Sequence, residues 1–134
     1  MAKYYDVSER FGEIIAAEYW GLVPYALYKY QHILEINNSE IWFLTWLFMH
    51  QWGADETYPS LNALSRYSGR SRAYIQKIVR SLERKGLLEV RERFMPNGAR
   101  ASNYYNLQPI IEQLEEIIKH DDRSNFNTHN ENNS

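Results

Sequence analysis

The segment from residue 60 to residue 107 constrains the fold of this chain more than any other part. It begins with two stretches of helical pattern, at residues 60–67 and 71–85, joined by Ser-Gly-Arg at 68–70. Each stretch starts with a serine, which suits a helix cap because its hydroxyl accepts from a free N–H of the first turn. A short link that contains glycine is typical of a helix-turn-helix unit, so we predict one here.

The second of these helices has two opposite faces. Its aliphatic face follows helical spacing and consists of Ile75, Ile78, Val79 and Leu82. At about 100° per residue, the opposite face consists of Ala73, Lys77, Arg80 and Arg84, with Gln76 at its edge. Gly86 is suited to end the helix. We therefore expect the aliphatic face to pack on the core and the cationic face to meet solvent or a ligand.

After Gly86 the apolar residues follow a period of two, which indicates β-structure. In the first predicted strand, the side chains that point inward are Leu88, Val90 and Phe94. Arg91 and Arg93 point outward. Pro-Asn-Gly at 96–98 is a turn signal. The second strand, residues 102–107, returns with Tyr105 and Leu107 inward, and Arg100 lies near the tip. The predicted fold is mostly α (α+β), a winged helix-turn-helix with a two-stranded β wing and helical extensions at both ends.

Charge is distributed unevenly along the chain. Residues 66–100 contain ten basic and three acidic residues, a net charge of +7, whereas the whole chain carries −2. A run of charge is often only a solvated surface. Here it coincides with the helix-turn-helix pattern, which favours a basic binding face on an acidic body.

The predicted interface with double-stranded DNA follows from this arrangement. An α-helix fits the major groove, where Lys and Arg prefer guanine and Gln prefers adenine. Residues at the start of the helix suit phosphate contacts, and arginines of the wing suit phosphates or the minor groove. The candidate residues are Arg70, Ser71, Arg72, Ala73, Gln76, Lys77, Arg80, Arg84, Arg91, Arg93 and Arg100.

The same residues resemble a known family. Ser-Gly-x-Ser at 68–71, Tyr-Ile-x-Lys-Ile at 74–78, Leu-Glu-x-Lys-Gly-Leu-Leu at 82–88 and Ser-Asn-x-Tyr at 102–105 look like the winged helices of DnaD-like initiators and replisome organisers. Upstream, Gly-Leu-Val-Pro at 21–24 and Leu-Glu-Ile-Asn at 34–37 resemble the DnaD amino-terminal module. Tyr74 departs from the small threonine usual in that family. The resemblance implies a role in starting replication of a chromosome, plasmid or phage, with a replisome or helicase-loading protein as a partner.

The remaining chain divides into three parts around the predicted DNA-binding domain at 21–108. Residues 1–20 are expected to form an arm with a helix from Ser8 to about Tyr19, which packs on a second copy or adds to the core. Residues 109–120 have apolar residues at helical spacing, and residues 121–134 are polar and rich in asparagine. We expect a C-terminal amphipathic helix followed by a disordered polar tail.

Two helices are candidates for self-association as a homodimer. From Ile41 to Met49 only Thr45 is polar, so this helix is either a central core helix or partly an interface. The C-terminal helix either packs back on the domain or pairs with its counterpart. The candidate residues for self-association are Trp42, Trp46, Ile110, Leu114 and Ile117.

Signals for catalysis are lacking in the sequence. The four histidines have no metal-ligand spacing and there is no glycine-rich phosphate loop, so we expect neither an enzyme nor a cofactor or metal site. The chain has no cysteine and no secretory signal, and the apolar helix is too short to span a membrane, so we expect a cytoplasmic protein with no membrane partner.

Two other functions remain open from the sequence. A small winged-helix transcriptional regulator would use the same fold, and the length of 134 residues suits one. The polar tail suits a module of a longer replication protein instead. In a different class, the tryptophan-rich helix and the acidic flanks would fit a protein-interaction module.

Overall fold

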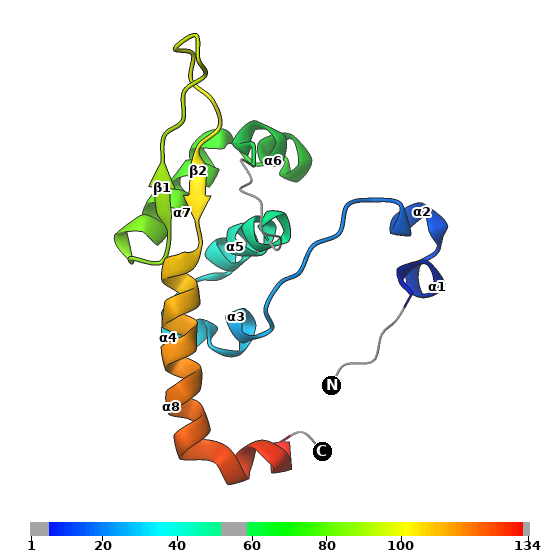
Figure 1. Cartoon of the computed structure of the whole chain (residues 1–134), viewed down its shortest axis with the longest axis vertical. Coiled ribbons are helices and arrows are strands. Elements are labelled where there is room, and N and C mark those ends of the chain that lie inside the picture. The colour runs from blue at the N-terminus through cyan, green and yellow to red at the C-terminus, as the bar shows by residue number, and fades with distance from the viewer. Residues whose placement is uncertain (1–5, 52–58, 133–134) are drawn as a thin grey trace.

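The computed structural model describes residues 6–51 and 59–132, with side chains as far as residue 121. Its elements, shown in Figure 1, are α1 (Val7–Phe11), α2 (Glu13–Ala16), α3 (Ala26–Lys29), α4 (Gln31–Leu34), α5 (Asn38–His50), α6 (Leu61–Ser68), α7 (Arg72–Arg84), β1 (Glu89–Arg91), β2 (Tyr104–Asn106) and α8 (Gln108–Asn132). A helical body with a two-stranded antiparallel sheet confirms the predicted mostly-α, winged-helix-like fold. The first five residues of the predicted arm and the last two of the predicted tail lie outside the described residues.

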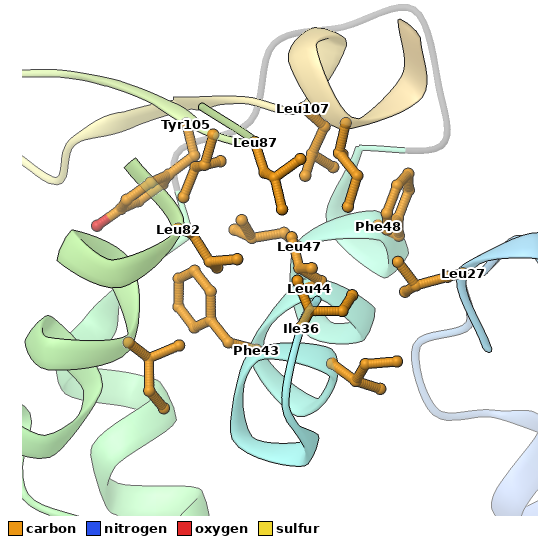
Figure 2. Close-up of a cluster of buried hydrophobic side chains, with 14 of the residues drawn as sticks. Leu27, Ile36, Phe43, Leu44, Leu47, Phe48, Leu82, Leu87, Tyr105 and Leu107 are labelled. Carbon is orange, nitrogen blue, oxygen red and sulfur yellow. The ribbon is translucent and has the colours of Figure 1, made fainter. Parts of the chain in front are cut away.

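The core is built around α5. A capping box begins this helix: the Asn37 side chain accepts from the Glu40 N–H at 2.8 Å, and the Glu40 carboxylate accepts from the Asn37 N–H at 2.9 Å. Figure 2 shows α5 side chains in contact with residues from α3, α7 and the strand β2. Phe43, Leu44 and Leu47 are fully buried, so α5 is a central core helix.

The helix-turn-helix forms as the sequence predicted. Ser60 caps α6 and Ser71 caps α7, each accepting from a backbone N–H in the first turn. Gly69 connects the two helices at φ +72°, a backbone conformation that residues with a Cβ rarely adopt. All four residues of the predicted aliphatic face are buried against the core, namely Ile75, Ile78, Val79 and Leu82.

The wing is an antiparallel pair whose register places Val90 opposite Tyr105. Tyr105 and Leu107 are buried, as predicted. The prediction that Phe94 points inward is wrong, because 60% of its surface is exposed. Figure 1 shows the reason: the hairpin projects past the helical body at this point, so no core lies beneath it.

The N-terminal arm differs from the single helix predicted from Ser8 to about Tyr19. Gly12 adopts φ +84° and separates α1 from α2, which ends at Ala16. Beyond α2, the Tyr19 hydroxyl donates to the Met49 carbonyl at 2.9 Å. Gly21 also approaches the Met49 backbone so closely that a Cβ would collide with it. The arm is therefore anchored at the C-terminal end of α5.

The C-terminal helix is longer than the predicted range of residues 109–120. It continues to Asn132, where the sequence suggested a disordered tail from Asp121. The chain has no proline or glycine after Pro109 to stop the helix. In addition, the Tyr30 hydroxyl donates to the Asp121 carboxylate at 2.7 Å and so ties α8 to the end of α3.

Residues proposed for self-association lie largely inside the chain's own core. Ile110 and Leu114 of α8 are 0% and 5% exposed, so α8 packs back on the domain and these side chains are not available to a second copy. Ile117, Trp42 and Trp46 are partly buried and pack against the same core.

One buried charge joins α5 to α7. The Glu40 carboxylate is 1% exposed, and accepts from the Lys85 ammonium at 2.7 Å and from the Ser81 hydroxyl at 2.8 Å. Burial raises the pKa of Glu40, but hydrogen bonds from Lys85, the Asn37 N–H and Ser81 outweigh it and hold that pKa below its ordinary value. A buried carboxylate with three donors fixes the position of the C-terminal end of α7 on α5.

We expect Glu40→Gln to lower the free energy of unfolding by about 2 kcal/mol at neutral pH, because charge-assisted hydrogen bonds are lost. Since the pKa is lowered in the folded state, this contribution is complete above the unfolded pKa of about 4.3 and is lost as pH falls through the folded pKa. Urea unfolding at pH 7 and pH 3 measures this difference. The exposed Glu115→Gln serves as control, and an equal gap at both pH values would contradict the prediction.

Candidate nucleic-acid interface

The exposed face of α7 carries the cations predicted from the helical pattern. Lys77, Arg80 and Arg84 are all exposed, and in the part of the chain that the structure describes none forms an ion pair or a hydrogen bond. Ala73 is exposed on the same face, and Gln76 is half-buried at its edge. This face therefore offers three free cations and one amide to a ligand.

The start of α7 places the next three candidates together. Ser71 uses its hydroxyl to cap the helix, accepting from the Tyr74 N–H at 3.1 Å. The Arg72 guanidinium donates to the Asn62 side chain of α6 at 2.5 Å. Arg70 is exposed in the turn, with its guanidinium 5.2 Å from the centre of the Tyr74 ring. Both arginines remain at the surface beside the helix N-terminus.

The wing arginines interact within the wing itself. Arg91 lies over the Tyr104 ring at 4.3 Å and near Glu89 at 3.6 Å. Arg100 donates to Asn103 at 3.0 Å and lies 3.5 Å from Glu92. These exposed contacts are weak, so both guanidinium groups can exchange them for other anions.

Arg93 has a structural role. It is half-buried, and its guanidinium donates to the Ser102 carbonyl across the hairpin at 2.9 Å. The prediction that Arg93 contacts nucleic acid stays untested, but its position ties the two sides of the wing together.

A groove of about 650 Å³ runs between α7 and the wing. Four of the predicted residues line it, namely Arg72, Gln76, Arg80 and Arg100. The sequence reasoning missed its other polar residues, which include Asn62, Asn103, Glu83 and Glu92. Glu83 lies one helical turn from Arg80 on α7, so helical spacing could have found it. No spacing rule links Asn62 of α6 or the wing residues to α7, so only the fold brings these together. The two carboxylates make the groove mixed in charge, whereas the outer face of α7 is cationic.

Tyr74 and the tryptophans of α5 face a different side. The Tyr74 hydroxyl hydrogen-bonds to Ser39 of α5 at 2.9 Å, so the ring lies toward α5 and away from the cationic face. This position explains how a residue larger than the threonine expected from the family resemblance is accommodated. Trp42 lines a hollow of about 340 Å³ with Tyr74 and Arg70, while Trp46 packs on His50.

The described residues form neither a metal-binding cluster nor a membrane span. Within the described ranges, no group of three or more His, Asp or Glu side chains is placed to hold a metal ion. Nor does any described helix combine the length and the apolar character that crossing a bilayer requires.

A helix-turn-helix with an exposed cationic second helix and a β wing defines a winged-helix module. Comparison with protein families then gives the particular one: the model of the DnaD N-terminal domain matches residues 23–125. The chain belongs to this family, which confirms the resemblance seen in its residues, and the family is one of non-enzymatic, replication-related organisers. No curated protein matches the chain significantly.

We expect Arg93→Ala to lower the free energy of unfolding by about 1 kcal/mol, because the hydrogen bond that closes the wing is lost. Lys77→Ala should change it by less than about 0.5 kcal/mol, since this exposed side chain has no partner among the described residues. Urea unfolding of the two variants measures the difference. Equal effects would show that Arg93 is a surface cation like Lys77.

Proposed function

We propose that this protein binds double-stranded DNA with α7 in the major groove and the wing against the neighbouring backbone, in the initiation of DNA replication. The observation that carries the proposal is the outer face of α7. Its three cations are exposed and free of acidic partners among the described residues, although the chain as a whole is acidic. Phosphate neutralisation by such cations supplies most of the affinity of a DNA-binding protein.

The contacts divide by position. Gln76, Lys77 and Arg80 lie along the middle of α7, where they meet base edges or the flanking phosphates. Arg70 and Arg72 bind phosphates beside the helix N-terminus, and Arg91 and Arg100 do so from the wing. Arg84, at the end of the helix, contacts the backbone.

The role in replication rests on the family, and its finer parts are proposals. A chromosome, plasmid or phage origin is the proposed target, with a replisome or helicase-loading protein as partner. A transcriptional regulator would use the same surface and would be distinguished by a promoter target. The protein-interaction alternative is weaker, because Trp42 and Trp46 pack against the chain's own core.

We expect the affinity of the wild type for random duplex DNA to fall about 10²–10³-fold over a fourfold rise in salt, for about five phosphate contacts. Lys77→Ala/Arg80→Ala should bind about 100-fold more weakly at low salt, with the slope of log K against log salt smaller by about 2. Fluorescence anisotropy measures both quantities.

The matched control removes two cations elsewhere, Lys29→Ala/Lys119→Ala, and should bind within about twofold of the wild type. Failure of the wild type to bind any duplex at low salt would refute the proposal. Equal weakening by the two double variants would mean that overall charge, and not the face of α7, determines binding.

Dimerisation through the N-terminal arm is a second part of the proposal. The arm exposes several large apolar side chains, with Ile14 at 90%, Ile15 at 52% and Tyr19 at 64%. Large apolar side chains left exposed within one short segment favour an interaction site. Because α8 buries Ile110 and Leu114 in the chain's own core, the arm is the better surface for a second copy.

We expect Ile14→Ser/Ile15→Ser to convert a dimer into a monomer, which analytical ultracentrifugation measures. The melting temperature of the monomeric domain should be the same in the variant and in the wild type. These side chains contribute nothing to the described core, so the fold should be unaffected. An arm-independent control is Phe94→Ala/Met95→Ala, which should remain dimeric. A wild type that is monomeric at all concentrations would rule out the arm as a dimer contact.

A further inference from the structure

The tip of the wing exposes two large apolar side chains. Phe94 is 60% exposed and Met95 is 48% exposed, and Pro96 beside them is exposed as well. Figure 1 shows this hairpin projecting beyond the helices, with α8 leaving the body in the opposite direction. An aromatic and a thioether held in water at the end of a hairpin have no role in the described core.

The tip is held in one conformation by its own hydrogen bonds. The Met95 N–H donates to the Ala99 carbonyl at 2.7 Å, and the Gly98 N–H donates back to the Met95 carbonyl at 2.8 Å. The Asn97 side chain accepts from the Ala99 N–H at 3.0 Å, and Gly98 adopts φ +87°. With Pro96 restricting the turn further, little conformational entropy is lost when the tip docks.

Cations lie directly behind the apolar tip. Arg100 is paired with Phe94 across the hairpin, and among the described residues its guanidinium makes exposed contacts to Glu92 and Asn103. Arg91 lies on the other side of the hairpin, at the end of β1, with its guanidinium over the Tyr104 ring. An apolar hairpin tip with guanidinium groups behind it is complementary to the minor groove of DNA. This groove is narrow, its walls carry phosphates, and its floor is formed by stacked bases.

Resting on the proposed function, we infer that the wing tip is a wedge. Phe94 and Met95 enter the minor groove and partly unstack one base step, while Arg100 binds the phosphate beside it. Phe and Met are among the side chains that architectural proteins insert in this way, and the kink brings more of the duplex onto the protein. Flexible pyrimidine–purine steps are the favoured substrate, because they unstack most easily.

The test compares binding to two duplexes of about 30 base pairs that share one strand. In the first the second strand is fully complementary, and in the second it creates a central two-base mismatch. We expect the wild type to bind the mismatched duplex about tenfold more tightly, since its step is already unstacked. It should also raise energy transfer between dyes at the two duplex ends, because the paired duplex bends. Phe94→Ala/Met95→Ala should lose both effects yet keep the salt dependence.

Two further variants control the test. Ile33→Ala removes an equally exposed apolar side chain on α4 and should behave as the wild type. Phe94→Leu keeps an apolar wedge and should retain the preference. Salt-sensitive binding with no mismatch preference and no bending would overturn the wedge while leaving duplex binding intact. An equal loss of affinity for both duplexes in the alanine variant would also overturn it, because the tip would then be a general docking contact. Failure of the wild type to bind either duplex would instead overturn the proposed function.

Discussion

The packing of α7 against α5 is the constraint on which the rest of the molecule depends. Aliphatic side chains along α7 pack against the core. At the C-terminal end of the same helix, the buried Glu40 carboxylate accepts hydrogen bonds from Ser81 and Lys85. Because these contacts fix the rotation of α7 about its axis, the opposite face of the helix is exposed to solvent. The cationic face is thus a consequence of how the apolar and buried polar groups of α7 are satisfied.

Features that depend on local spacing could be predicted from the sequence. The helical period of α7, the apolar run of α5 and the serine caps of α6 and α7 each involve residues that are close together in the sequence. Burial of Tyr105 and Leu107 also followed from strand alternation. For the candidate interface, the exposed position of Lys77 and Arg80 was likewise a local property.

Features that depend on where the chain leaves the body could not be predicted. The alternation that placed Phe94 inward holds only while the strand lies over the core, and the hairpin projects beyond it. Partners of the charged residues were also hidden, because Lys85 meets Glu40 across 45 positions. The continuation of α8 past His120 depends in part on the contact of Asp121 with Tyr30.

These tertiary partners change what the basic segment of the sequence means. Of its cations, Lys85 stabilises the contact between α5 and α7, and Arg93 closes the wing, so neither charge is freely available to a ligand. Lys77, Arg80 and Arg84, at the middle and end of α7, are exposed and have no ion pair or hydrogen bond among the described residues. A net charge of +7 over this segment therefore overstates its capacity to neutralise phosphates, and the position of each cation matters more than their number.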